Sequence, residues 1–539
     1  MEVAAAARRG RSRAGGGGWG VASVLAAAVV AVPLLVLPLS FLRSSGTWDR
    51  IAPDILPEAL RNSLVLALGV GAGTLVLGTA LAVLVTFYDF PLRRIFEWAL
   101  VLPLAMPAYV LTFVLLGQYD ASSPVQSALR AVLGDGARLP DLRSAGGTIF
   151  VLTLVLYPYV YLLARSAFVG QSRGLLEAAR SLGHSHRGAI ARVALPLARP
   201  ALAAGTALAV MEALADFGAV NLLGFRALTD AIYRVWYGAF DRVAALQLGA
   251  VLLGLVLLLL ALERGTRRGR SVEQRGGRGD EVVRRRLGGW RAAAAVALPA
   301  LLVAVVVAGP VAQLVAWAVA SLGNGTYSTL LADARNSILL AFVASVVAVG
   351  LAVVVVYGVR LAPTRPRRWA ARSASVGYAV PGSVAAAAVF LVLDRADNVL
   401  GVVLTGTLLA LVLAYTVRFT ALALQTVEAR MAAIPTALDA AARSLGAGRG
   451  RVLGEIHAPL LGPGMATAAL LVFVEVLKEL PATVLLRPFG LDTLAIAVWE
   501  ATKESLYETA AFPALLLVAV GVVPVIVLVR LVDRRAGES

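Results

Sequence analysis

The chain has 539 residues, of which 59% are hydrophobic and only 15% charged, and its mean hydropathy is +0.82. Soluble domains carry about 25% charged residues, and a single core cannot bury so much apolar surface, so the composition excludes an ordinary soluble protein. The absence of cysteine excludes disulfides and thiolate metal sites. The net charge of +17 would suit a nucleic-acid-binding protein, but the basic residues lie in short clusters between apolar runs, which is typical of membrane topology.

Apolar stretches that are long enough to cross a bilayer as helices recur along the whole chain. One crossing needs about 20 mostly apolar residues. The first half contains such stretches at 21–42, 62–87, 95–117, 148–169, 200–223 and 244–262. The second half contains them at 292–320, 336–358, 373–393, 400–424, 464–486 and 511–531. We therefore predict an all-α polytopic membrane protein with twelve transmembrane helices in a lipid bilayer.

The first apolar stretch is predicted to be a retained span rather than a cleaved secretory signal. Arginines at positions 8, 9, 11 and 13 precede it, as basic residues precede the core of a signal. However, residues 21–42 form a longer apolar run than a signal core, and no small-residue cleavage motif closes the run cleanly. The chain is therefore expected to keep this segment.

The distribution of basic residues predicts the orientation of the chain. If the N-terminus is cytoplasmic and the spans alternate in direction, the cytoplasmic segments hold most of the 49 Lys and Arg residues. This asymmetry is what the positive-inside rule requires. Both termini are then cytoplasmic, as tails at 1–20 and 532–539.

Short motifs recur at a constant distance, which indicates an internal duplication. The sequence RNSL at 61–64 returns as RNSI at 335–338, 274 residues later. The sequence AARSLG at 178–183 returns unchanged at 441–446, 263 residues later. Because each repeat covers six spans in the same direction, we predict two parallel halves rather than inverted ones.

A basic linker joins the two predicted halves. The first half covers 21–262 and the second 292–531, and the linker at 263–291 contains ten Arg and four acidic residues, is rich in glycine and lacks apolar periodicity. This composition predicts a solvated cytoplasmic tether. Contact of the linker with nucleic acid or with anionic lipid is the alternative interpretation.

A long cytoplasmic loop follows the fourth span of each half, at 175–200 and 438–463. Each loop has a helix-forming run of Ala, Leu and Arg, then Gly183 or Gly446 as a breaker, then a second helical run, and a proline thirteen residues after the glycine. The pattern predicts a helix–turn–helix outside the bilayer. Such an element suits a groove on a partner protein, and a helix lying on anionic headgroups is the alternative for either copy taken alone.

The two loops resemble the EAA motif of binding-protein-dependent ABC importers, in which Glu-Ala-Ala is followed by a glycine and later by an apolar residue and proline. The first loop matches the motif with Glu177, Ala178, Ala179, Gly183 and Pro196. The second loop matches it with Ala441, Ala442, Gly446 and Pro459. The second loop departs at the glutamate, because Ala440 stands there and Asp439 comes one position earlier.

The resemblance implies a transport complex of several chains. In this family the two loops insert into two copies of a cytoplasmic ABC ATPase, which holds ATP and Mg, so this chain would need no cofactor of its own. A soluble or lipid-anchored substrate-binding protein would deliver the solute. The expected location is the inner (cytoplasmic) membrane of a bacterium, and no nucleic-acid partner is expected.

Three further segments look like the fused permeases of ferric-iron importers, namely 212–220, 231–248 and 478–495. This resemblance implies ferric iron as the solute. Related permeases for thiamine or another small solute share the same plan, so they remain an alternative. A secondary transporter driven by an ion gradient also has twelve spans in two parallel halves, but it does not need the paired loops.

No nucleotide-binding loop is present in the sequence. A Walker A loop needs glycine directly before its lysine, whereas Leu477 precedes Lys478 and Thr502 precedes Lys503, and the chain has no other lysine. We therefore predict a transport subunit rather than an enzyme, with ATP hydrolysis on a separate polypeptide. No nucleophile–base pairing favours a membrane enzyme.

Ionisable side chains stand inside two predicted spans, where each costs about 2.5–3.5 kcal/mol to insert. They are Glu212 and Asp216 in the fifth span and Glu475, Lys478 and Glu479 in the eleventh. One interpretation is that they line a pathway that favours a cationic solute. The other is that paired charges fix how the two spans cross. Both stay open, and the spacing of Glu475 and Lys478 predicts an ion pair on one helix face.

Two smaller expectations concern metals and prolines. The three histidines, His184, His186 and His457, lie in connecting segments, so no metal site is expected in this chain. Kinks are expected in the third and ninth spans and near the end of the eleventh, because proline frees a backbone carbonyl inside a helix. The prolines are Pro107, Pro381 and Pro481.

Overall fold

The structure is a computed structural model that describes residues 17–120, 123–171, 173–267, 284–322, 329–375 and 377–537. Most of these residues are helical. Strand pairing among them is limited to β1 (Tyr88–Asp89) and β2 (Arg285–Arg286), which run parallel. The predicted all-α polytopic fold class is confirmed.

The chain forms two compact units, and each unit contains segments of both sequence halves. Unit 1 comprises residues 1–46, 235–250 and 331–493, and unit 2 comprises residues 47–234, 251–330 and 494–539. The first helix of each half thus belongs to the unit that consists mainly of the other half. The predicted domain boundaries at 21–262 and 292–531 follow the sequence duplication and not these compact units. They stay a prediction.

Unit 1 combines the N-terminal helix with helices of the second half. Its elements are α2 (Gly17–Val36), α16 (Leu330–Leu361), α17 (Arg365–Ala374), α18 (Gly382–Leu400), α19 (Leu408–Ala433), α20 (Thr436–Ser444), α21 (Arg449–Val452), α22 (Ala458–Leu477) and α23 (Pro481–Leu486). Helix α2 packs against α17, α18 and α19. It also approaches α16 closely at Gly358, where a Cβ atom would lie 2.3 Å from the Cβ of Ser23.

Unit 2 contains most of the first half together with four helices of the second. Its elements are α3 (Trp48–Phe87), α4 (Arg93–Ala99), α5 (Ala108–Tyr119), α6 (Pro124–Leu133), α7 (Ala145–Val169), α8 (Arg173–Ser181), α9 (His186–Ala189), α10 (Leu195–Ala215), α11 (Gly218–Leu222), α14 (Gly289–Val303), α15 (Gly309–Ala320), α24 (Leu494–Lys503) and α25 (Tyr507–Gly537). Helices α12 (Leu228–Tyr237) and α13 (Arg242–Arg267) have residues in both units.

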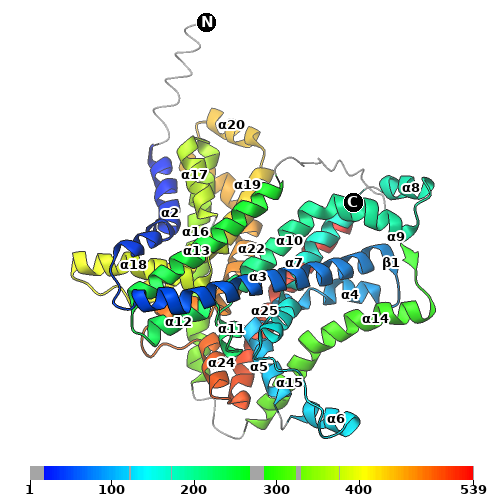
Figure 1. Cartoon of the computed structure of the whole chain (residues 1–539). Helices are drawn as coiled ribbons and strands as arrows, with labels where there is room; N and C mark the ends of the chain where they lie inside the picture. Colours follow the sequence, from blue (N-terminus) through cyan, green and yellow to red (C-terminus); the bar gives the residue numbers. More distant parts are fainter. Residues whose placement is uncertain are drawn as a thin grey trace. The chain divides into compact units, whose positions relative to one another are not determined.

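Helices α3, α7 and α10 pack side by side in unit 2 (Figure 1). Glycines on the two outer helices meet the same part of α7: a Cβ atom at Gly78 would lie 2.8 Å from the carbonyl oxygen of Tyr157, and one at Gly205 would lie 2.8 Å from the Cα of Val160. Small residues let membrane helices approach backbone to backbone, where van der Waals packing holds them together. The helix that follows the first loop is therefore held firmly along its length.

Nine helices among the described residues are long and apolar enough to cross a membrane. They are Gly18–Leu42, Trp48–Phe87, Ala145–Val169, His186–Ala215, Arg242–Glu263, Gly289–Ala320, Leu330–Leu361, Leu408–Ala433 and Arg449–Leu477. A tenth candidate is the bent pair Arg93–Ala105 and Ala108–Tyr119, and Tyr507–Val523 is a shorter apolar helix. A multi-pass membrane protein is thus confirmed, whereas the number twelve stays a prediction.

Several predicted spans are broken rather than continuous. In the third span the helix axis turns by 93° between the segments that end at Ala105 and begin at Ala108. Pro107 has extended backbone angles and precedes the first residue of α5, and Pro381 precedes α18 in the same way. A proline before a helix lacks the N–H that the preceding turn would need. The kinks expected at Pro107 and Pro381 are therefore present, as complete breaks.

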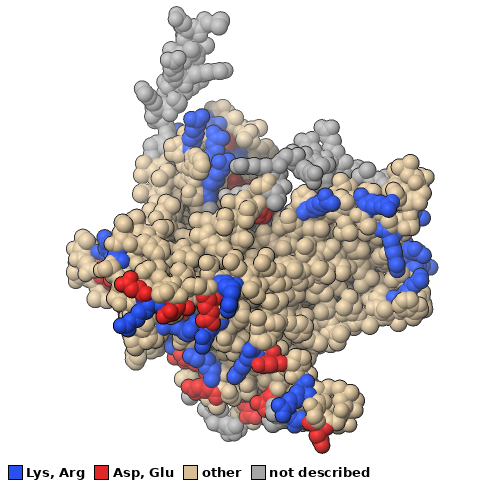
Figure 2. Space-filling view, in the orientation of Figure 1, with Lys and Arg blue, Asp and Glu red and all other residues tan. Residues whose placement is uncertain are grey.

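The predicted linker lies partly outside the described residues, which omit 268–283, as they omit 1–16 of the predicted N-terminal tail and 538–539 of the C-terminal tail. The end of the linker is not a free tether, because Arg285–Arg286 pairs with β1 and Gly289 begins α14. Basic side chains gather over the end of unit 2 that carries α8, α9 and the start of α14 (Figure 2).

Candidate coupling loops and charges within the spans

The first predicted loop is a helix–turn–helix of α8 and α9. Gly183 ends α8 with a left-handed φ of +86°, and the N–H of His184 donates to the carbonyl of Ala179 at 3.1 Å. This bond caps the last turn of the helix. Nothing lies within 4 Å of a Cβ atom built at Gly183, so the backbone angle, and not crowding, requires glycine.

The second loop repeats this geometry with α20 and α21. Gly446 has a φ of +80°, and the N–H of Ala447 donates to the carbonyl of Ala442 at 3.0 Å. Space around Gly446 is again open. The helix–turn–helix that the sequence repeat predicts is therefore present in both halves.

A large apolar side chain stands at the tip of each turn. Leu182 is 82% exposed and Leu445, its counterpart in the second repeat, is 88% exposed, whereas Ala179 and Ala442 are buried against their own units. Glu177, Ala178 and Ala441 are exposed on the outer face of the same helices. In each unit an exposed leucine at the turn thus presents an apolar tip that suits a groove on a partner protein.

Each loop continues directly into a long apolar helix. A π-helical turn, Ile190–Ala194, connects α9 to α10, and the turn Leu453–His457 connects α21 to α22 in the same way. Pro196 and Pro459 follow these turns within the first positions of α10 and α22. The wider turn accommodates a proline that cannot donate to the preceding turn and would otherwise clash with it. The loop and the membrane helix thus form one continuous element in each half.

Asp439 is bound within unit 1 rather than presented at the surface. Its carboxylate accepts hydrogen bonds from Arg360 Nε at 2.9 Å and contacts His457 Nε2 at 2.7 Å. Burial acts to raise the pKa of Asp439, but the hydrogen bonds to Arg360 and His457 outweigh it and hold the pKa below its ordinary value. The one acidic residue in the EAA region of the second loop therefore has a structural role.

Arg360 and His457 complete this anchor; Arg360 was not singled out from the sequence, and His457 was considered there only as a metal ligand. Arg360 also donates to the carbonyls of Met431 at 2.7 Å and Ile434 at 2.9 Å, so it joins the ends of α16 and α19 to α20. His457 is fully buried, with Nδ1 3.1 Å from the sulfur of Met431. The first half has Leu176 and Ala194 at the positions of Asp439 and His457, so the anchor exists in the second loop alone.

Asp216 and Glu479 each cap a short helix at a break in a span. Asp216 Oδ1 accepts from the N–H of Ala219 at 2.8 Å, and Glu479 Oε1 accepts from the N–H of Ala482 at 3.1 Å. The two acids are equivalent in the repeat, and they precede α11 and α23. Backbone groups freed at a break within a membrane need such partners.

Glu479 is also half of a buried ion pair. Its Oε2 lies 2.7 Å from Arg418 of α19, and the two side chains are 4% and 8% exposed. Arg418 stands in the predicted tenth span, and the sequence analysis missed it. An arginine inside an apolar run was the available signal, because a buried guanidinium requires an acidic partner.

Glu475 and Lys478 form the ion pair that their spacing predicts, with Nζ 2.8 Å from Oε1. Both side chains are partly exposed. Glu212, the counterpart of Glu475, is also partly exposed, and both glutamates precede the capping acid of their span by one helical turn. Among the described residues, no group of three His, Asp or Glu side chains is placed to hold a metal ion.

The repeated RNSL motif holds the segment that follows each broken span. Asn62 Nδ2 donates to the carbonyl of Arg226 at 3.0 Å, and Asn336 Nδ2 donates to the carbonyl of Asp492 at 3.0 Å. These two carbonyls belong to the connections α11–α12 and α23–α24. The motif therefore stabilises equivalent loops in the two repeats, a role that the sequence alone did not reveal.

A family model described as the inner membrane component of binding-protein-dependent transport systems matches the chain twice, over residues 74–265 and 355–538. The two matches fall in the two halves of the sequence and together cover most of it. Each match includes one of the helix–turn–helix loops.

The chain is similar to several characterised or named permeases. It is 27% identical to the Fe(3+)-transport system permease protein FbpB 2 of Haemophilus influenzae over 481 residues, which cover 88% of this chain and 90% of that protein. It is 30% identical to a probable molybdenum ABC transporter permease of Haloferax volcanii over 46% of this chain and 91% of the relative. The sulfate transport system permease CysT of Salmonella typhimurium is 26% identical over 43% of this chain and 84% of that protein.

Proposed function

Because the chain belongs to the family of inner membrane components of binding-protein-dependent transport systems, we propose that it is the fused permease subunit of an ATP-driven importer of ferric iron. Its place as a multi-pass inner-membrane transport subunit follows from the family and the apolar helices. The iron substrate, the number of ATPase copies and the orientation of the termini are the parts that we propose.

The paired helix–turn–helix loops are the observation that supports ATP-driven transport. Each loop presents an exposed leucine on a rigid turn and continues into a membrane helix through a π-helical turn. A partner that moves the turn therefore moves the helix. One cytoplasmic ATPase subunit binds each loop, so two copies bind this chain, and both termini lie on the same side as the loops.

The choice of ferric iron rests on the extent of the similarity. The relative that carries Fe(3+) in its name matches nearly the whole chain, whereas the molybdenum and sulfate relatives match about half of it. A separate binding protein captures the iron outside the cell, and the permease provides its passage. ATP and Mg are held by the ATPase.

Glu212 and Glu475 are the proposed pathway acids, whereas Asp216, Glu479 and Lys478 maintain the broken spans and their charge balance. The support is that both glutamates are partly exposed. We expect the double variant Glu212→Gln and Glu475→Gln to assemble normally. Its transport rate should fall to about one tenth of the wild-type rate or below, since each carboxylate favours a cation electrostatically. Glu428→Gln, at an exposed site on α19, serves as the control, and unchanged uptake by the double variant would remove the pathway role.

Radiolabelled ferric-iron uptake into vesicles tests the proposal. The vesicles contain this chain, its ATPase and its binding protein, with and without ATP. We expect uptake only with ATP, and its loss when Gly183 and Gly446 are replaced by leucine, because both require a left-handed backbone. Gly462→Leu is the control, since Gly462 lies in α22 with open space around it and a helical backbone.

The other outcomes separate the parts of the proposal. ATP turnover stimulated by the binding protein without iron uptake would keep the importer and reject iron, and thiamine, molybdate and sulfate would then be tried. Uptake that ignores ATP and follows a proton gradient would reject the mechanism.

A further inference from the structure

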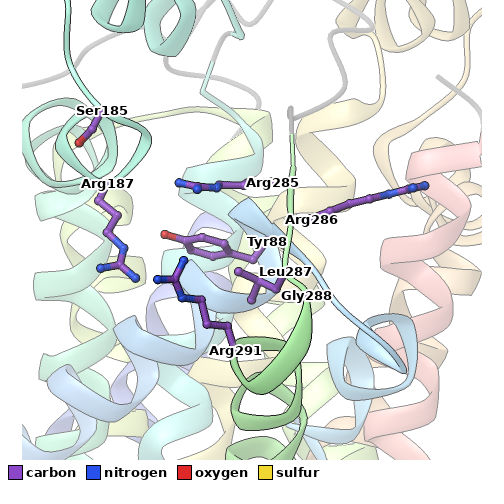
Figure 3. Close-up of a pocket in the computed structure, with 8 residues that line it drawn as sticks. All are labelled: Tyr88, Ser185, Arg187, Arg285, Arg286, Leu287, Gly288 and Arg291. Carbon is purple, nitrogen blue, oxygen red and sulfur yellow. The ribbon is translucent and has the colours of Figure 1, made fainter.

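A basic cavity lies at one end of unit 2, next to the first loop and apart from the charges within the spans. Its volume is about 330 Å³. The polar residues that line it are Tyr88, Ser185, Arg187, Arg285, Arg286 and Arg291 (Figure 3). No acidic side chain lines the cavity among the residues that the structure describes.

Three separate segments of the chain bring these side chains together. Tyr88 is in β1, directly after α3, and β1 pairs with Arg285–Arg286 of β2. The pairing is extended by the N–H of Leu287, which donates to the carbonyl of Asp89 at 2.9 Å. Ser185 caps α9 by accepting from the N–H of Gly188 at 3.1 Å. The end of the linker is therefore joined to the segment that follows α3, beside the turn of the first loop.

The side chains do not all point the same way. In Figure 3 the guanidinium groups of Arg187, Arg285 and Arg291 surround the hydroxyl of Tyr88, whereas Arg286 points away from them. Arg286 instead lies 3.7 Å from the carboxylate of Asp89. Within the described part of the chain, no ion pair is formed by the three converging arginines. All three arginines are exposed, so water screens their mutual repulsion, and an anion between them would remove what remains of it.

We propose that this cavity binds a phosphate group. A guanidinium presents a planar fork of N–H donors that matches phosphate oxygens, and a tyrosine hydroxyl adds one further donor. A phosphate accepts from several such donors at once. The side chains that line the cavity come from the ends of helices and from short segments between them. The cavity is open, so it can admit a phosphate that is attached to a larger molecule.

The position of the cavity identifies two sources of that phosphate. It lies where α3 ends, where the apolar helix that begins at His186 starts, and in the first turn of the apolar helix that begins at Gly289. The ends of membrane helices lie at the level of lipid headgroups, so an anionic phospholipid is one source. A soluble phosphate from the adjoining aqueous phase is the other.

The second loop has no such site. Gly448 and Gly450 stand at the positions that correspond to Ser185 and Arg187. A phosphate held in the cavity would join the first loop to the segment that enters the second half, and it would thus stabilise one of the two loops only. Binding of an anion on the loop side of unit 2 does not depend on which solute the chain transports.

Thermal unfolding of the purified full-length chain in neutral-lipid nanodiscs tests the proposal with two probes. One series contains increasing phosphatidylglycerol, and the other contains inorganic phosphate in the buffer at constant ionic strength. We expect at least one probe to raise the unfolding midpoint in a saturable way. Phosphatidylglycerol acting alone identifies a lipid headgroup, and inorganic phosphate acting in neutral lipid identifies a soluble anion.

Arginine variants decide whether the cavity is responsible. Substitution of Arg187, Arg285 and Arg291 by glutamine should weaken the apparent affinity by about tenfold or more, since each removes a charge-assisted hydrogen bond. Arg94→Gln is the matched control and should leave the affinity unchanged, because Arg94 is exposed on α4 and does not line the cavity. If the triple variant does not fold, the single variant Arg291→Gln is measured in its place. Absence of a shift with either probe, or equal shifts in the wild type and in the arginine variants, would overturn the proposal.

Discussion

Asp439 lies next to the EAA motif position at which a glutamate would contact the partner ATPase, but its carboxylate binds residues of its own unit. Its carboxylate is held by Arg360 and His457, so it secures α20 instead of facing a partner. Because its folded-state pKa lies below the ordinary 3.8, the ionised form stabilises the fold above that pH. The stabilisation is lost as the pH falls through the lower folded-state pKa.

We expect Asp439→Ala to lower the free energy of unfolding by about 1–3 kcal/mol at about pH 7, because two buried donors lose their acceptor. The difference from wild type should shrink at acid pH, as the pH falls below 3.8 and through the lower folded-state pKa, because the wild-type carboxylate then also becomes protonated. Thermal unfolding of the detergent-solubilised chain measures both. Glu455→Ala is the control, because Glu455 forms an exposed pair with Arg451. A loss of stability that is equally large at both pH values would contradict the role of the charge.

The buried pair of Arg418 and Glu479 makes a second prediction for single residues. Removing one partner leaves an unpaired buried charge, so Arg418→Leu alone should destabilise by about 3–5 kcal/mol. The double variant with Glu479→Gln should recover a large part of this loss, as buried ion pairs contribute little net stability. Unfolding midpoints of the two single variants and the double variant provide the measurement, and additive losses would show that the two side chains act independently.

Among the helices, the coupling role that we propose for the two loops requires an apolar tip and a turn of fixed geometry. The structure supplies both features twice, with Leu182 and Leu445 at the tips and glycines at the left-handed positions. The two loops differ at their bases, because the Arg360–Asp439–His457 anchor has no counterpart in the first half. The second loop is therefore expected to move less freely relative to its unit than the first.

Leu182→Glu and Leu445→Glu should each weaken binding of the ATPase by about ten- to a hundredfold. Burial of a leucine contributes about 1.5–3 kcal/mol, which corresponds to this range of affinity. Binding of the purified ATPase to the chain in nanodiscs is the measurement. Leu133→Glu is the control, because Leu133 is also exposed but ends α6 in a predicted outer loop. Unchanged affinity in both tip variants would place the contact elsewhere.

For the whole molecule, the basic residues and the two loops together predict one orientation. In this orientation the loops, the linker and both termini are predicted to be cytoplasmic, and α6 is predicted to lie on the outer side. The sequence contains no cysteine, so single introduced thiols report their own side without background. The orientation is thus open to a direct test in the intact chain.

In sealed inside-out vesicles, Leu182→Cys and Leu445→Cys should react with a membrane-impermeant maleimide, and Leu133→Cys should react only after the vesicles are opened. All three leucines are well exposed, so access to the thiol and not burial decides the result. Right-side-out vesicles should show the reverse pattern. Labelling of the loop cysteines from the outer side would contradict the predicted topology.

Features that depend on local pattern could be predicted from the amino-acid sequence: the apolar runs, the repeat, the glycines of the two loops and the Glu475–Lys478 pair one helical turn apart. These follow from periodicity and backbone preference over a few residues. The breaks near Pro107 and Pro381 were also predictable as kinks, although a turn of 93° was not, because the packing around a proline decides its angle.

Interactions between residues that lie far apart in the chain became visible in the folded molecule alone. Arg360 meets Asp439 across 79 positions, and Arg418 meets Glu479 across 61. The cavity of Arg187, Arg285 and Arg291 likewise draws on segments about a hundred residues apart, and the exchange of the first helices between the units has no local signal. A buried charged group needs a partner or solvent nearby, but the linear sequence does not show which partner the fold brings close to it.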